Sequence, residues 1–370
     1  VLAACQPAAE TTSEPAISDD ASMASETTAE ETVPTEFPRN ETIYVSGAAW
    51  GPASTWNPFQ PGSLANTTGT IGFVYEFLYA LDPQTGELTP WLAESGTWAD
   101  DTTFDVTLRS GLTWTDGEPL TAEGGAFTFE LGKQYAALWF SPMWEYVESV
   151  TALSDTEVEF KLSSDPLYQE FENNLYNVPI VPKHLWENMS EEDITVGVNE
   201  NPIGSGAYKY LTNSEDRNIW VRSEEWWGND VFGVPAPKYI VDIRTSSNNV
   251  ALGMVLKGEI DLSNNFLPGV AEMADKGYVK TYYAEAPYML SANTAVLFLN
   301  TTLKPLDDAA FRRALAFAID VPSIVNVAYA QLVKAASPSG LLPVLDKYVD
   351  QDVMAELGYY FDIAQAKQML

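Results

Sequence analysis

Residues 108–123 read LRSGLTWTDGEPLTAE, and the segment that leads into them has a regular apolar pattern. In Phe104–Leu108, phenylalanine, valine and leucine alternate with aspartate and threonine. The same alternation returns in Glu157–Leu162. An apolar side chain at every second position is typical of a strand with one buried face and one polar face. Both segments are therefore predicted to be half-buried antiparallel strands.

Two shorter signals lie nearer the N-terminus. Thr42–Ser46 predicts a β-strand, because its isoleucine and valine fall on one face. Gly69–Leu81 carries apolar residues at intervals of three and four. This spacing predicts a helix that ends before the turn at Asp82-Pro83.

The composition of the 370-residue chain narrows the class of protein. A hydrophobic content of 46% is enough for large cores. The net charge of −33 would repel phosphate backbones, so nucleic acid is a poor partner. No segment approaches the ~18 to 20 apolar residues that a membrane-spanning helix needs. Because Cys5 and His184 are the only cysteine and histidine, neither a metal site nor a cofactor is expected.

The N-terminal residues predict an anchor and a tether. Leu2–Cys5 reads Leu-Ala-Ala-Cys and resembles a bacterial lipobox, whose cysteine is acylated; the alternative is an arbitrary cysteine in a disordered tail. Gln6–Glu41 is rich in Ala, Thr, Ser, Pro and Glu, and such a segment cannot bury a core. Residues 1–41 are thus predicted to be the remnant of a lipobox signal followed by a disordered acidic tether. Lipidation at Cys5 would hold the protein outside the cytoplasmic membrane, on the periplasmic side or at the cell surface.

Several motifs follow one another in a fixed order. Besides residues 108–123, they are NPIGSGAYK at 201–209, EWWG at 225–228, KGEID at 257–261, FLN at 298–300 and FRRALAFAID at 311–320. Together they resemble the family 5 extracellular solute-binding proteins, which include the oligopeptide, dipeptide, nickel and cellobiose receptors of ABC importers. The resemblance extends over about residues 42–370.

The chain departs from the family pattern in two places. Gly124-Gly125 stands where the family continues its helix, and two interior glycines cost roughly 1 kcal/mol each relative to alanine, so this helix is expected to start late or kink. Residues 364–370 read as an amphipathic helix, and family members continue well beyond such a point. The resemblance therefore implies that a C-terminal part is missing.

The resemblance implies an α/β fold of the two-lobed, type II periplasmic-binding-protein kind, with mixed sheets, helices and an inserted extra domain. Residues 42–75 and 200–290 would form the sheet domain of the first lobe. Residues 76–199 would form the inserted domain, and residues 291–370 would begin the second lobe.

A ligand cleft between the lobes, outside the strand ends, is a further implication. It would be lined by the loop after the first strand, the loop after Asp261 and the end of a strand at Val296–Asn300. The candidate ligand-binding residues on these segments are Trp50, Trp56, Asn57, Asn264, Asn265, Phe266 and Asn300. Indole rings and amides suit a polar ligand with apolar faces. Two alternatives stay open: the tryptophans pack between domains, and Asn57-Pro58 is a turn.

The expected function is capture of an oligopeptide or oligosaccharide and its delivery to the permease of an ABC importer, by a monomer that touches the membrane only through its lipid. The 11 tryptophans favour a sugar only weakly, so the ligand class stays open. The alternative is a secreted glycoside hydrolase with paired carboxylates. Acidic clusters such as Asp100-Asp101 read as turns or caps, so no catalytic residue is predicted.

Three other features have structural interpretations. Arg312-Arg313 is assigned to the polar face of a helix whose N-cap is Asp307 or Asp308. Gly204–Gly206 is interpreted as a tight turn, because the segment lacks the ending of a phosphate-binding loop. His184 is interpreted as a packed or surface residue, since no nucleophile signature accompanies it.

Overall fold

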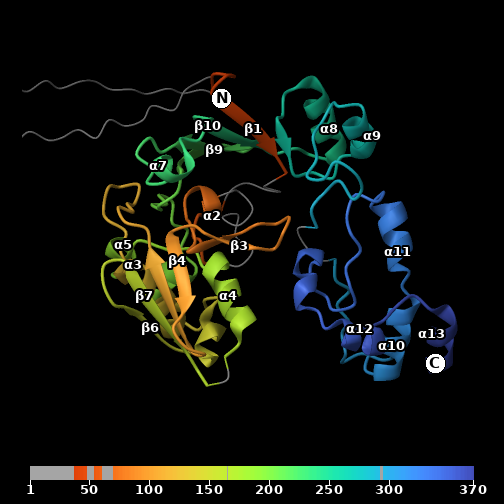
Figure 1. The fold of residues 1–370 in the computed structure, drawn as a ribbon. Coiled ribbons are helices and arrows are strands. Elements are labelled where there is room, and N and C mark those ends of the chain that lie inside the picture. Colours follow the sequence, from red (N-terminus) through yellow and green to blue (C-terminus); the bar gives the residue numbers. More distant parts are fainter. Residues whose placement is uncertain (1–36, 48–53, 61–69, 165, 292–294) are drawn as a thin grey trace, which may run out of the picture. The chain divides into compact units, whose positions relative to one another are not determined.

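A computed structural model describes residues 37–47, 54–60, 70–164, 166–291 and 295–370 (Figure 1). Cys5, most of the predicted tether and Trp50 lie outside the described residues. Among the described helices, none is long and apolar enough to cross a membrane.

The first sheet has five strands in the order β11-β1-β10-β9-β8. Its strands are β1 (Thr42–Ser46), β8 (Tyr208–Asn213), β9 (Arg217–Arg222), β10 (Tyr239–Ile243) and β11 (Leu262–Ser263). β1 pairs in parallel with both β10 and β11, whereas β9 pairs antiparallel with β10 and β8. The sheet is therefore mixed, and the strand predicted at Thr42–Ser46 is confirmed.

The second sheet has four antiparallel strands in the order β4-β5-β7-β6. They are β4 (Ala93–Trp98), β5 (Thr103–Leu108), β6 (Val147–Ala152) and β7 (Glu157–Leu162). Alternate residues of β5 and β7 are buried, and Phe104 lies opposite Phe160. Both strands predicted from the period of two are confirmed. A smaller two-stranded sheet joins β2 (Tyr79–Leu81) and β3 (Leu88–Pro90).

Helix α3 (Ala122–Gln134) packs against β6 and β7. The expectation of a late start or kink at Gly124-Gly125 is wrong, because the helix begins at Ala122 and runs through both glycines. Eight of its residues are buried, so its packing on the sheet outweighs the low helix propensity of glycine. The backbone at Gly125 also lies close to the sheet, since a Cβ atom there would be 3.8 Å from Val158 Cγ2.

The helix predicted for Gly69–Leu81 is also wrong. One short turn, α2 (Thr70–Phe73), is followed by extended chain and then by β2. Val74, Tyr75 and Leu78 are nonetheless all buried, at 1% exposure or less. The spacing of these residues thus indicates burial correctly, but the segment passes through the core as extended chain and does not form a helix.

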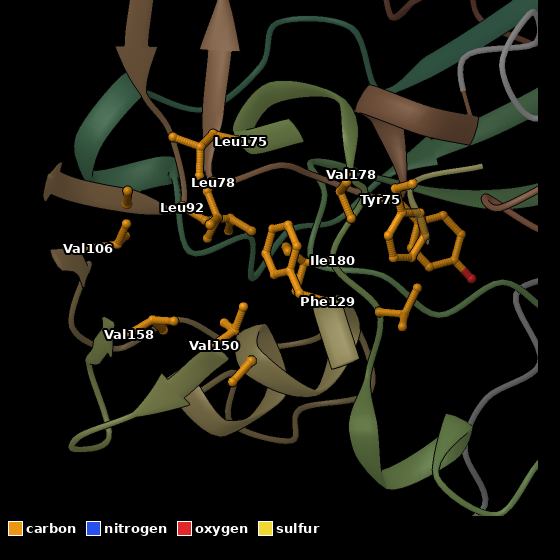
Figure 2. Close-up of a cluster of buried hydrophobic side chains, with 14 of the residues drawn as sticks. Tyr75, Leu78, Leu92, Val106, Phe129, Val150, Val158, Leu175, Val178 and Ile180 are labelled. Carbon is orange, nitrogen blue, oxygen red and sulfur yellow. The ribbon is translucent and has the colours of Figure 1, made fainter. Parts of the chain in front are cut away.

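One continuous hydrophobic core unites both sheets. Figure 2 shows part of it, where Leu78, Leu92 and Phe129 meet valines from the four-stranded sheet. Its largest fully buried side chains include Trp186, Trp220, Phe59, Phe140 and Phe171. The remaining elements around this core are η1 (Ser141–Glu145), α4 (Tyr168–Asn177), α5 (Lys183–Trp186), α6 (Glu191–Thr195) and α7 (Asn229–Phe232).

A second, smaller core lies around α8 (Asn248–Lys257) and α9 (Val270–Asp275). Ser247 caps α8 by accepting a hydrogen bond from the backbone N–H of Val250. Gly258 ends the helix in the left-handed conformation, with φ 74°.

The C-terminal residues form α10 (Ala309–Ala318), α11 (Val321–Ser323), η2 (Ile324–Ala328), η3 (Pro343–Tyr348), α12 (Gln351–Leu357) and α13 (Ile363–Met369). Asp308 caps α10 through its carboxylate, as one of the two predicted N-caps. The strand predicted at Val296–Asn300 is wrong, because described residues 295–300 adopt no strand and Phe298 is 89% exposed. A strand forms only beside a partner strand, and no described residue pairs with this segment.

Candidate functional site

The carboxyl ends of the parallel strands β1 and β11 carry a cluster of small polar side chains. Ser46 ends β1 and Ser263 ends β11, and their hydroxyl oxygens lie 3.3 Å apart. The amide Nδ2 of Asn265 donates to Ser46 Oγ at 2.8 Å and to Ser263 Oγ at 3.1 Å. Asn264 donates its backbone N–H to Ser46 O. We call Ser46, Ser263, Asn264, Asn265 and Phe266 the strand-end cluster.

Gly47 shows how closely the two loops of this cluster approach. The residue has φ 84°, a conformation that favours glycine. A Cβ atom at this position would lie 2.7 Å from Asn265 N and 2.8 Å from Asn264 C. The loop after β1 therefore starts directly against the loop after β11, as expected where parallel strands end at the same edge.

Phe266 provides the exposed apolar side chain of the strand-end cluster. Its side chain is 41% exposed and meets Tyr329 edge-to-face, with ring centroids 6.2 Å apart. Asn264 is exposed, and its Nδ2 donates to Gly47 O at 3.3 Å. Asn265 is 4% exposed, so the exposed ring of Phe266 and the exposed amide of Asn264 are the groups that the cluster offers to an apolar face and a polar group of a ligand.

Trp56 and Asn57 have other surroundings. Trp56 is 9% exposed, and its ring centroid lies 4.8 Å from that of Tyr210. Asn57 is fully buried, with Nδ2 donating to the carbonyl oxygens of Ile194, Asp193 and Gly197 at 2.9 to 3.2 Å. Its Oδ1 accepts from the backbone N–H of Phe59 at 2.9 Å, as in an Asx turn. Asn57 thus joins residues 54–60 to α6 and the residues that follow it.

Of the seven predicted ligand-binding residues, the structure brings three together, namely Asn264, Asn265 and Phe266. Asn300 is exposed, and its Oδ1 accepts hydrogen bonds from the backbone and hydroxyl of Thr302. The contacts of the cluster given above do not include Trp56, Asn57 or Asn300. Trp50 is not described.

Two features with structural interpretations have clear partners. His184 Nε2 lies 2.8 Å from Asp116 Oδ2, and both side chains are about one-third exposed. Gly206 N donates to Val74 O at 2.9 Å, and a Cβ atom at Gly206 would lie only 2.0 Å from Phe73 O. The glycines at 204 and 206 therefore allow two backbones to pack in contact.

Glu76 is a buried acid that the sequence analysis missed. Its side chain is 1% exposed and accepts hydrogen bonds from three indole N–H groups. A signal was available, because Glu76 stands alone between Tyr75 and Phe77 in an apolar segment. A lone carboxylate in such a segment needs buried donors.

Most of the chain matches a family of known proteins. The family model described as bacterial extracellular solute-binding proteins, family 5 Middle, matches residues 87–370. The chain belongs to family 5 of the bacterial extracellular solute-binding proteins. The resemblance found in the motifs is thereby confirmed.

Relatives and solved structures of family 5 proteins agree with this assignment. The nickel-binding periplasmic protein of Escherichia coli is 28% identical over 247 residues, which are 65% of this chain and 45% of that protein. The oligopeptide-binding protein AppA of Bacillus subtilis is 27% identical over 60% of this chain and 40% of its own length. This chain therefore spans less than half the length of either relative.

A periplasmic oligopeptide-binding protein of Thermotoga maritima has been solved twice. The two structures are 44% and 45% identical to this family 5 chain, with TM-scores of 0.81 and 0.82, and the second holds bound mannohexaose. Each match covers 90% of this chain and 62% of the solved one. The predicted α/β fold of the type II periplasmic-binding-protein kind is confirmed.

Proposed function

We propose that this protein is an extracytoplasmic receptor that captures an oligosaccharide and delivers it to the permease of an ABC importer. The observation that carries this proposal is the 45% identity, over 90% of the chain, to a protein that holds mannohexaose. The strand-end cluster supports it, because Phe266 offers an exposed ring and Asn264 an exposed amide. Trp50 and Asn300 remain predicted members of the same site, whereas we expect the buried Trp56 and Asn57 to have the packing and turn roles that the sequence left open.

An oligopeptide is the second candidate ligand. It is favoured by the 27% identity to the oligopeptide-binding protein AppA, and the Thermotoga maritima protein is itself described as oligopeptide-binding. The two candidates differ in what the ligand offers to the site. A sugar presents hydroxyl groups and an apolar ring face to amides and aromatic rings, whereas a peptide presents its backbone amides.

Titration calorimetry separates these candidates. The protein expressed from its complete reading frame should bind mannohexaose with saturating heat at one site, and a hexapeptide mixture of equal concentration should give none. Saturation by peptides with no response to mannohexaose would contradict the proposal and favour the peptide. Chromatography of the recovered mannohexaose should show no shorter products, since a receptor returns its ligand intact; shorter products would indicate the glycoside hydrolase.

We also propose that Cys5 carries the lipid that anchors the receptor. In bacteria that express the complete precursor, Cys5→Ser should move the protein from the membrane fraction to the soluble fraction, because the acyl chains provide the membrane affinity. Ser13→Ala, a substitution in the same acidic segment, should leave the protein with the membranes. Equal membrane retention of the wild-type and Cys5→Ser proteins would contradict the anchor.

A further inference from the structure

Three tryptophans direct their ring N–H groups at one buried carboxylate. Glu76 Oε1 accepts from Trp91 Nε1 at 3.0 Å and from Trp226 Nε1 at 3.2 Å, while Oε2 accepts from Trp227 Nε1 at 2.8 Å. Ser205 is also buried, and its hydroxyl acts to lower the pKa of Glu76. We call these five residues the Glu76 cluster.

The cluster joins segments that are far apart in the chain. Trp91 lies between β3 and β4, at the edge of the four-stranded sheet. Trp226 and Trp227 follow β9 of the five-stranded sheet and are about 150 residues from Glu76. The backbone oxygen of Glu76 accepts a hydrogen bond from Ile180 N at 2.9 Å. A single side chain therefore connects the segment before β4 to the segment after β9.

Phe232 and Arg109 pack against the indoles of the cluster. The ring of Trp91 stacks on Phe232 with centroids 4.5 Å apart and an interplanar angle of 12°. The guanidinium of Arg109 lies 6.0 Å from the ring centroid of Trp227 and 5.6 Å from that of Phe232. Arg109 Nε also donates to Trp91 O at 2.6 Å. These contacts hold the indoles in the orientation in which all three N–H groups point at Glu76.

We propose that the Glu76 cluster is a proton-sensitive joint, in which the gain or loss of one proton by a buried carboxyl group changes how the segment after β9 is held to the segment before β4. The ionised carboxylate can accept from all three indoles. In a protonated carboxyl group one oxygen is a hydroxyl that donates a hydrogen bond. Fewer acceptor positions are then left for the three indole N–H groups. The two protonation states thus differ in the hydrogen bonding of the indoles.

The surroundings of Glu76 favour proton uptake. Burial raises the pKa of Glu76 to about 7, although the hydrogen bonds from the indoles of Trp227, Trp91 and Trp226 and the nearby hydroxyl of Ser205 act in the opposite direction. Charged residues on the elements around the cluster include Glu94, Arg109, Arg222, Glu224, Glu225 and Asp230, and none of them is among the causes of the shift.

The sign of the linkage follows from the raised pKa. Because the pKa of Glu76 is above its ordinary value of 4.5, the folded protein binds a proton between about pH 4.5 and 7 that the unfolded chain does not. The stabilisation from Glu76 is therefore complete below about pH 4.5 and is lost as the pH rises through 7.

Tryptophan fluorescence of the folded protein tests the joint directly, because three indoles contact the titrating group. Between pH 5 and 8.5 the wild-type protein should show a transition with its midpoint near 7. His184→Gln should keep this transition, and it is the matched control because His184 is the only histidine of the chain. Glu76→Gln should abolish it. A flat wild-type titration, a transition that survives in Glu76→Gln, or one that disappears in His184→Gln would overturn the proposal.

A second variant keeps the test valid if Glu76→Gln fails to fold. Trp227→Phe retains an aromatic ring but removes the N–H group that donates to Glu76 Oε2. Loss of a hydrogen bond to the ionised form should move the midpoint upward by about one pH unit. A midpoint that stays in place or moves downward in the folded variant would overturn the proposal.

Discussion

A Gly206→Ala variant is expected to lose about 4 kcal/mol or more of its free energy of unfolding, the largest effect of any substitution considered for this protein. The added Cβ atom would lie 2.0 Å from Phe73 O and 2.6 Å from Phe73 C. Both atoms belong to the backbone, so a change of side-chain rotamer cannot relieve the overlap. Relief of the overlap would separate residues 204–206 from the Phe73–Val74 segment and break the hydrogen bond from Gly206 N to Val74 O.

Denaturant titration followed by circular dichroism measures this loss, and Gly253→Ala provides the matched control. Gly253 lies inside α8, where a Cβ atom would meet no atom within 4 Å. Alanine should raise the free energy of unfolding there by up to about 1 kcal/mol, because it is the better helix former. If Gly206→Ala unfolded at the same denaturant concentration as the wild-type protein, the close approach of the two backbones would be disproved.

The strands β5 and β7 show what the local sequence can predict. Their alternation of apolar and polar residues arises from the pleat, which places successive side chains on opposite faces. A sheet with one buried face therefore produces an alternation of apolar and polar residues within each strand, and this pattern can be recognised without knowledge of distant residues. The N-cap at Asp308 was predictable for the same reason, since a cap depends on residues only two or three positions away.

The segment from residue 70 to 81 shows where local reasoning fails. Apolar residues at intervals of three and four fit one face of a helix, but they also fit an extended segment that is surrounded by core on several sides. Val74 and Tyr75 are both buried although they are adjacent, which a one-sided helix does not require. The surrounding sheets decide the conformation of this segment, and their strands come from residues 42–46 and 93–263.

The place of the strand-end cluster was predictable, whereas the ligand contacts stay a prediction. The resemblance to family 5 directed attention to the loop after β11, and Asn264 and Asn265 of that loop contact Gly47 and the end of β1. The burial of Asn57 depends on carbonyl groups at 193–197, about 140 residues away. The partners of Glu76 are up to 151 residues distant. No periodicity within one segment can indicate contacts of this range.

Trp56→Ala is expected to lower the free energy of unfolding by about 3 to 5 kcal/mol, the range for removal of a large buried aromatic side chain. Trp56 is 9% exposed and packs on Tyr210, and its backbone N–H donates to Val198 O at 2.8 Å. Phe266→Ala is the matched comparison, because Phe266 is 41% exposed in the strand-end cluster. It should change stability by less than about 0.5 kcal/mol, as an exposed residue does.

Ligand affinity should respond in the opposite way if the strand-end cluster binds the sugar. Phe266→Ala should weaken mannohexaose binding by about 1 to 3 kcal/mol, the range expected for loss of an aromatic anchor. Under conditions where it stays folded, Trp56→Ala should bind with nearly wild-type affinity, because the ring of Trp56 packs on Tyr210 in the wild-type protein. Calorimetry and denaturant titration on both variants separate the two roles. A Trp56→Ala protein of wild-type stability that no longer binds would assign the ligand contact to Trp56. Unchanged affinity in Phe266→Ala would remove the strand-end cluster from the binding site.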